Sequence, residues 1–296
     1  MTNEFKTYHP IVNFLYFAFM IGFSCVFMHP VSLAISLIGA FSYSVVLKGR
    51  KSIKSNILYM LPTVVLMALL NPLFNHQGVT ILTYLPSGNP LTAESIIYGT
   101  SAAVMVISVI CWFSCSNEIM TSDKTVYLFG RVTPSLSLIL SMTFRFVPRF
   151  IKQTKAVADA QRGIGNDVSG GKLINRIKTA VKILSIMITW SLENAVETAD
   201  SMKSRGYGTK RRTAFSIYRF GRRDISALVA MLALGTYIVM GAVYGGMYFS
   251  YFPLITHNGI SVYSISVFSA YAIFAFLPVI IEVWEVMRWK AIKSKI

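Results

Sequence analysis

The chain has 296 residues, of which 54% are hydrophobic and 14% are charged, and its mean hydropathy is +0.57. A chain this apolar cannot cover its surface with polar groups as a soluble globule, so its composition predicts a membrane protein. The formal net charge of +16 indicates an anionic partner, which can be nucleic acid, lipid head groups or an acidic protein surface.

Apolar runs near the length of about 20 residues that a bilayer core requires predict six transmembrane helices. The predicted spans are residues 11–28, 31–47, 57–74, 95–115, 225–249 and 260–284. Only His29 and Pro30 separate the first two, which predicts a tight hairpin. The fold class expected is therefore all-α and polytopic.

Basic residues in the short connections predict the orientation of these spans. Lys48, Arg50, Lys51 and Lys54 follow the second span, and Arg288, Lys290, Lys293 and Lys295 follow the last. The connections at residues 71–94 and 250–259 contain no Lys or Arg. The pattern predicts N- and C-termini in the cytoplasm.

Residues 117–224 form a different kind of segment, in which apolar residues recur at helical spacing but charges interrupt them too often for a membrane span. This divides the chain into residues 1–116 with about four spans, the segment 117–224, and residues 225–296 with about two spans and a basic tail. Two long amphipathic helices are predicted, at 134–161 and 172–204, after a shorter one at 124–133. Their apolar stripes contain Leu136, Leu140, Val147, Phe150 and Ile151 in the first, and Leu173, Ile177, Val181, Leu184 and Ile188 in the second.

Each long helix runs into a break that contains glycine and follows an arginine. The breaks read Gln161-Arg162-Gly163-Ile164-Gly165 and Ser204-Arg205-Gly206-Tyr207-Gly208. Glycine suits the C-terminal end of a helix, and an arginine in the last turn is placed to project beyond the helix tip. On spacing alone, an ordinary basic C-cap explains these residues equally well.

With these paired motifs, the chain resembles the transmembrane T component of energy-coupling factor ABC transporters, the family that includes the membrane subunit of cobalt and nickel importers. Three further segments agree with the resemblance: Tyr8-His9-Pro10, Arg145-Phe146-Val147-Pro148 and Arg222-Arg223-Asp224. Gln161 and Ser204 stand where alanine is frequent before the arginine, which is one departure from the family pattern.

The resemblance implies a non-catalytic scaffold without a cofactor, located in the inner membrane of a bacterial or archaeal cell. Gln161, Arg162, Gly163, Ser204, Arg205 and Gly206 would dock two ABC ATPase subunits, identical or different, with Arg145 and Pro148 in support. A separate S component in the membrane would bind the substrate, a vitamin or a transition-metal ion. The apolar stripes of the two long helices would supply the surface for that subunit.

Other functions fit the residues less well. A phosphate-binding loop around Gly171 and Lys172 fails, because Asn166 and Leu173 stand where such a loop needs Gly and Ser or Thr. The scattered histidines disfavour a metal centre or an enzyme, and the basic segment has no nucleic-acid module. Anionic lipid explains the basic residues at 210–223. The alternative that stays open is a permease that lines its own substrate path, although the predicted spans contain few ionisable groups.

Overall fold

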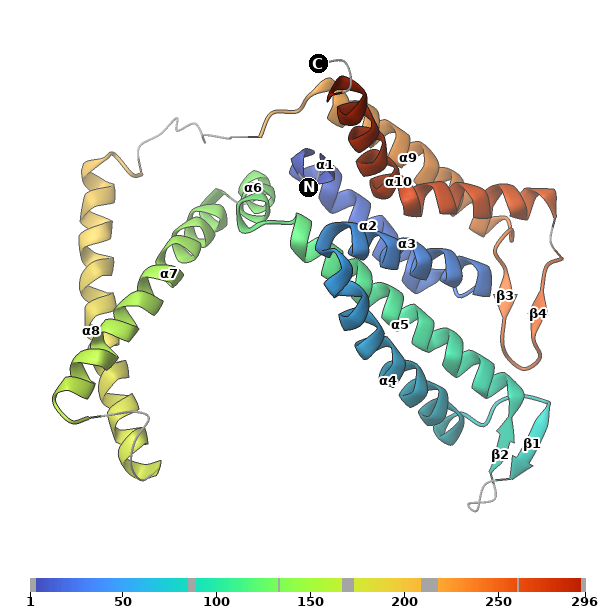
Figure 1. The fold of residues 1–296 in the computed structure, drawn as a ribbon, viewed down its shortest axis with the longest axis horizontal. Helices are drawn as coiled ribbons and strands as arrows, with labels where there is room; N and C mark the ends of the chain where they lie inside the picture. Colours follow the sequence, from blue (N-terminus) through green and yellow to red (C-terminus); the bar gives the residue numbers. More distant parts are fainter. Residues whose placement is uncertain are drawn as a thin grey trace. The chain divides into compact units, whose positions relative to one another are not determined.

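The computed structural model describes residues 4–84, 89–132, 134–166, 173–208, 218–259 and 261–293, which are mostly helical (Figure 1). The chain forms two compact units. One combines Met1–Lys124 with Tyr218–Ile296 and is called the membrane unit here. The other, Thr125–Ile217, is called the α7–α8 unit after its two long helices.

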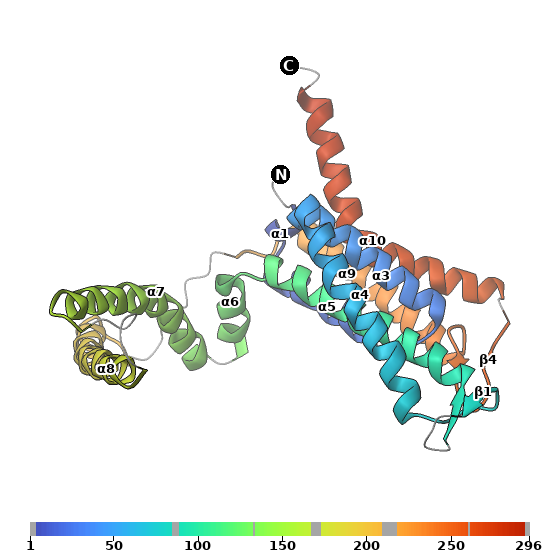
Figure 2. The ribbon, with the colours of Figure 1, turned by 60° about the horizontal axis from the view of Figure 1, so that its bottom comes forward.

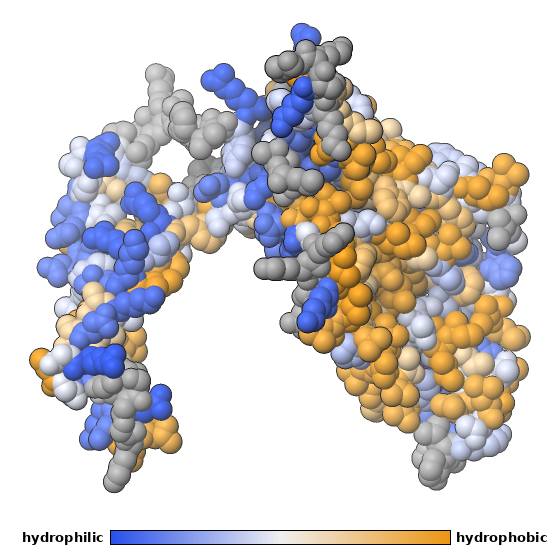
Figure 3. Space-filling view, in the orientation of Figure 1, coloured by the Kyte–Doolittle hydropathy of each residue, from blue (hydrophilic) through white to orange (hydrophobic). Residues whose placement is uncertain are grey.

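The membrane unit contains the apolar helices, and these confirm the predicted all-α polytopic fold. They are α2 (Pro10–Val26), α3 (Pro30–Lys48), α4 (Arg50–Phe74), α5 (Ala93–Ile119), α9 (Arg222–Val243) and α10 (Val262–Lys293), preceded by the single turn α1 (Glu4–Thr7). Five of these are long and apolar enough to cross a bilayer, and α2 is a shorter apolar helix. Apolar side chains dominate the face of the unit that is seen in Figure 3, as contact with lipid requires.

The first two apolar helices begin in the same way, at a His-Pro pair. In each, the histidine is the N-cap and its Nδ1 accepts a hydrogen bond from the backbone two residues on, at 3.3 Å for His9 and 3.2 Å for His29. Pro10 and Pro30 occupy the first helical position, where a missing N–H costs nothing. Only three residues separate α2 from α3, so the predicted tight hairpin is present.

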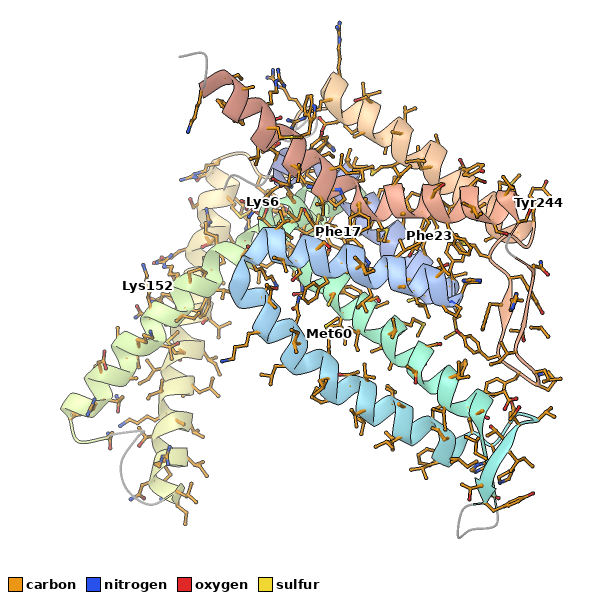
Figure 4. All side chains as sticks on the ribbon, turned by 45° about the vertical axis from the view of Figure 1, so that its right-hand side comes forward. Lys6, Phe17, Phe23, Met60, Lys152 and Tyr244 are labelled. Carbon is orange, nitrogen blue, oxygen red and sulfur yellow. The ribbon has the colours of Figure 1, made fainter. Side chains whose placement is uncertain are left out.

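Aromatic side chains form the centre of the membrane unit. Tyr16, Phe17 and Trp112 are at most 2% exposed, and the Trp112 ring lies 5.9 Å from that of Tyr16 between ring centroids. Figure 4 shows Phe17 and Phe23 on α2 among the neighbouring helices. The Trp112 indole donates a hydrogen bond to Ser36 Oγ at 3.0 Å, which satisfies a polar group that burial would otherwise penalise.

Two short strand pairs connect the helices at the end of the membrane unit farther from α1 (Figure 1). They are β1 (Ile81–Tyr84) with β2 (Pro90–Thr92), and β3 (Phe249–Ser250) with β4 (Thr256–His257), both antiparallel. The fifth span was predicted to reach Phe249, and this was wrong. The helix ends at Val243, because Gly245 adopts a φ of +78° and turns the chain into β3.

The last helix is longer than predicted and changes direction along its length (Figure 2). Pro278 lies inside α10, where it removes a backbone donor and favours a bend. Helix α4 contains two prolines, Pro62 and Pro72, and packs on α5 and α3. Only 6% of its most apolar stretch is fully buried within the chain, so much of its surface faces outward.

The α7–α8 unit follows α6 (Ser122–Val132), whose first three residues still belong to the membrane unit. Its two long helices are α7 (Pro134–Gly163) and α8 (Leu173–Ser204). They pack together through Phe150 and Trp190, whose rings meet edge to face with centroids 5.3 Å apart. The Arg149 guanidinium lies 5.4 Å from the centroid of the Trp190 ring, a cation–π contact that adds to this junction.

Candidate functional site

The C-terminal end of α7 is closed by a Schellman motif, in which a glycine with positive φ lets the chain turn back on the last helical carbonyls. Gly165 has a φ of +83°, and its N–H donates to the Arg162 carbonyl at 3.0 Å. The Asn166 N–H donates to the Gln161 carbonyl at 2.9 Å. Arg162 and Gly163 therefore belong to the last turn of the helix, and the capping glycine is Gly165.

The C-terminal end of α8 is closed by the same motif in a different register. Gly206 has a φ of +78°, and its N–H donates to the Lys203 carbonyl at 2.9 Å. The Tyr207 N–H donates to the Met202 carbonyl, also at 2.9 Å. Here the glycine of the motif is itself the cap, and Arg205 lies just outside the helix.

The two arginines consequently leave their helices at different places relative to the cap. Arg162 precedes its capping glycine by three residues and Arg205 by one, and both side chains are exposed. A difference of two residues corresponds to about 200° around a helix axis. The sequence motifs look alike, but the geometry that presents their arginines is not the same.

This difference predicts opposite responses to alanine at the two motif glycines. Gly163→Ala is expected to slow amide hydrogen exchange at the end of α7, because no atom lies within 4 Å of the added Cβ and alanine favours a helix by about 0.5–1 kcal/mol. Gly206→Ala is expected to speed exchange at the end of α8, because positive φ costs a non-glycine residue about 1–2 kcal/mol. Mass-spectrometric hydrogen exchange measures both, and equal responses would contradict the difference in register.

The two helix ends lie at opposite ends of the α7–α8 unit (Figure 1). The helices meet at Phe150 and Trp190, each about 20 Å along its helix from the capped end. Only nine residues join the end of α7 to the start of α8, which then runs 32 residues, or about 48 Å, to its own end. One pair of packed helices thus presents two arginine side chains at two separate places.

Arg145 and Pro148 are not brought to either tip. Both are exposed on α7, and Arg145 lies 17 residues before Arg162, about 26 Å along the helix. The Arg145 guanidinium lies 5.6 Å from the centroid of its neighbour Phe146. Any role of these two residues is therefore exercised away from the capped ends.

The apolar stripe predicted on α8 faces outward. Its exposed residues are Leu173, Ile177, Val181, Leu184 and Ile188, continued by Leu192 and Val196, and all are more than half exposed. The face that α8 buries is a different one, made by Thr179, Ile183 and Met187. On α7, Val147 and Ile151 are likewise about half exposed, while Leu136 lies among residues whose side chains are not described.

A family model described as cobalt transport protein, CbiQ, matches residues 3–215, well over half of the chain. The chain belongs to this family. The match includes both capped ends with Arg162 and Arg205, and it confirms the family predicted from the paired motifs, the T component of energy-coupling factor transporters.

Individual relatives of the CbiQ-family chain are similar over shorter stretches. Energy-coupling factor transporter transmembrane protein EcfT of Lactobacillus helveticus is 32% identical over 112 residues, which are 38% of this chain and 40% of the relative. EcfT of Streptococcus thermophilus is 30% identical over 123 residues, 41% and 47% of the two chains. EcfT of Lacticaseibacillus paracasei is 38% identical over 100 residues, 33% and 38%. The matched stretches span less than half the length of each relative.

The basic stretch before α9 is only partly described. Lys210, Arg211 and Arg212, which were assigned to lipid head groups together with three later arginines, lie outside the described residues. Arg219 and Arg222 are exposed. Arg223 has partners within the chain, because its Nη2 donates to Thr7 Oγ1 at 2.7 Å, so lipid contact alone does not account for it.

Proposed function

We propose that this protein is the membrane scaffold of an energy-coupling factor importer, in which Arg162 and Arg205 each dock into one of two ABC ATPase subunits. The observation that carries the proposal is the pair of capped helix ends at opposite ends of one compact unit. A single scaffold of this form can follow two ATPases as they close and open. An arginine also suits a partner carboxylate, because its planar guanidinium donates two parallel hydrogen bonds.

The exposed apolar stripe of α8 is proposed to contact a separate substrate-binding subunit in the membrane. Seven aliphatic side chains, each more than half exposed, lie along one face of this helix. An exposed apolar surface of this extent is typical of an interaction site. Substrate recognition in that subunit leaves this chain without a substrate site of its own, and the proposed cargo is a vitamin or a transition-metal ion. ATP hydrolysis is assigned to the partner subunits.

The orientation proposed places both termini and the α7–α8 unit in the cytoplasm. Lys48 and Lys54 flank the α3–α4 junction, and Arg288 lies near the end of α10. The opposite connections, residues 75–92 and 244–261, contain no Lys or Arg. The excess of positive charge on one side supports cytoplasmic placement of that side.

Affinity purification of the tagged protein from its native membrane in mild detergent, followed by mass spectrometry, tests the proposal. We expect ATP-binding-cassette subunits and a small hydrophobic protein to co-purify, and the identity of the small protein would define the cargo. Recovery of the chain alone, with uptake retained after reconstitution, would overturn the proposal in favour of a permease that lines its own path.

A further inference from the structure

A buried lysine lies where the chain leaves the membrane unit. Lys124 is the last residue of that unit before the α7–α8 unit and is only 4% exposed. Its Nζ donates to the Lys6 carbonyl at 2.6 Å and approaches the Tyr8 carbonyl at 3.5 Å. With its amide turned to satisfy both neighbours, Asn13 accepts a third hydrogen bond from Nζ at 2.6 Å and donates to the Phe5 carbonyl at 3.1 Å.

These three acceptors of Lys124 are neutral oxygens, and all belong to residues 6–13. Burial lowers the pKa of Lys124 to about 8, and the positive charge of Lys6 contributes to the shift. The ammonium form still predominates at neutral pH, so its three N–H donors match the three oxygens. A buried charge of this kind persists only if its hydrogen bonds are made, which fixes the start of α6 to the N-terminal segment.

A buried aspartate lies where the chain returns to the membrane unit. Asp224, in the first turn of α9, is 7% exposed and accepts from the Gly221 N–H at 3.0 Å through Oδ2. Its other oxygen, Oδ1, accepts from the His9 N–H at 3.0 Å. The His9 ring packs on Phe220, with centroids 4.5 Å apart. One carboxylate thus caps α9 and binds the N-terminal segment.

Arg223 adds a second connection between α9 and the N-terminal segment. Its guanidinium lies 4.3 Å from the centroid of the Tyr8 ring, and its Nη2 donates to Thr7 Oγ1 at 2.7 Å. Its Nη1 lies 3.9 Å from Glu4 Oε2. An exposed ion pair at this distance contributes little by itself, so the cation–π contact and the hydrogen bond carry the connection.

The N-terminal segment is itself fixed to the core of the membrane unit. Phe5 is fully buried, and its ring meets that of Tyr16 edge to face at 5.3 Å between centroids. The Phe5 N–H donates to Glu282 Oε1 on α10 at 3.3 Å.

The points of exit and return also lie next to each other. Tyr218 is the first residue of the membrane unit after the α7–α8 unit. Burial raises the pKa of Tyr218, and the negative charge of Asp123 raises it further. A hydrogen bond with Thr121 acts in the opposite direction and lowers this pKa. Thr121 and Asp123 lie within three residues of Lys124, so side chains at the exit point and at the return point interact directly. The N-terminal segment binds Lys124 at the exit point and Asp224 near the return point.

From these contacts we infer that residues 4–13 act as a clamp, which fixes the exit and return points of the α7–α8 unit to each other, with Lys124 and Asp224 as its positioning residues. With the clamp in place, a displacement of the α7–α8 unit moves the membrane helices. Without it, the same displacement would only change the conformation of the chain where the two units join. This role rests on the proposed function, whereas the clamp contacts themselves do not.

The first test measures the clamp without any partner. Spin labels are placed at Ser122 and Arg219, both exposed, in the full chain with Cys25, an exposed cysteine, replaced by serine. Pulsed electron paramagnetic resonance in lipid nanodiscs is expected to give one narrow distance distribution. Lys124→Met and Asp224→Asn are expected to add a second, longer population, and Lys124→Arg to restore the narrow one.

Two exposed residues of α7, which lie outside the clamp, provide matched controls. Lys155→Met and Asp159→Asn remove the same charges, and both should leave the distance distribution unchanged. Should Lys124→Met not yield monodisperse protein, the isosteric Asp224→Asn carries the test. A narrow, unshifted distribution in Asp224→Asn would overturn the clamp.

The second test uses the complex with its co-purified ATPase subunits and MgATP as the probe. Labels at Lys178 in the α7–α8 unit and Ser226 in the membrane unit are expected to show an ATP-dependent distance change. That change should disappear in Lys124→Met and Asp224→Asn while ATP hydrolysis persists. A parent complex without any ATP-dependent change contradicts the proposed function, whereas a change that survives in both variants contradicts the clamp.

Discussion

Replacing both Arg162 and Arg205 with glutamate is expected to abolish recovery of the ATPase subunits while the protein stays in the membrane. Removing one partner of a buried, hydrogen-bonded ion pair costs about 3–5 kcal/mol, and a glutamate facing the same carboxylate adds repulsion. Even the lower figure weakens binding by more than a hundredfold at each tip, since about 1.4 kcal/mol is tenfold. The measurement is quantitative pull-down with the tagged chain from solubilised membranes.

The matched control is Lys178→Glu, which makes the same charge reversal at an exposed position near the start of α8. It should recover the ATPase subunits as the parent does. The two arginines are presented in different registers. We therefore expect Arg162→Glu and Arg205→Glu to lose unequal amounts of ATPase recovery when the two ATPases differ. Full recovery of both ATPases by the double variant would rule out docking through these arginines.

Gly241→Val is expected to destabilise the membrane unit more than other single substitutions of its helix-facing small residues. A Cβ at Gly241 in α9 would lie 2.6 Å from Cγ2 of Val267, a fully buried residue of α10. Small residues let membrane helices approach this closely, and the branched Val267 cannot swing aside. The expected loss is about 1–3 kcal/mol of unfolding free energy or more, seen as a lower thermal midpoint in detergent.

Gly22→Val is the control for this substitution, because Gly22 on α2 is exposed and nothing lies within 4 Å of its added Cβ. Its thermal midpoint should stay close to that of the parent. Equal midpoints for Gly241→Val and Gly22→Val would show that α9 and α10 do not pack as described.

The membrane helices could be predicted from sequence because the bilayer demands long apolar runs, and each predicted span corresponds to a helix. The predicted end of α9 was wrong, because residues 244–249 are as apolar as a membrane-spanning helix. The chain leaves the helix there only because Gly245 adopts a positive φ. Hydropathy carries no information on backbone dihedral angles, so the short β3–β4 pair was not foreseen.

The helix breaks after the two arginines were also predictable, because glycine is the usual residue at a left-handed cap. The register of the first cap was not. Two glycines, Gly163 and Gly165, flank Ile164, and the choice between them depends on which turn closes the hydrogen bonds to Gln161 and Arg162. The only sign of this ambiguity in the sequence was the Gly-x-Gly pattern after each arginine, which offers two possible capping glycines.

The clamp could not be predicted from sequence, because its interactions join residues far apart in the chain. Lys124 binds backbone carbonyls more than a hundred residues away, and a carbonyl has no signature in the sequence. In a basic segment Lys124 is indistinguishable from its exposed neighbours. His9 and Asp224 were both noted within family-like segments, but nothing in either segment indicated that they meet.

Helix α4 exposes much of its surface, including the side chains of Leu58, Leu61 and Leu69, each more than 60% exposed. In a bilayer such side chains touch either acyl chains or another protein, and the two are about equally apolar. Exchanging one for the other therefore brings little hydrophobic gain, and shape and close packing decide which is preferred. Any association through α4 would then depend on the fatty acids of the host membrane, so that a change in lipid composition would shift the assembly equilibrium without a change in sequence.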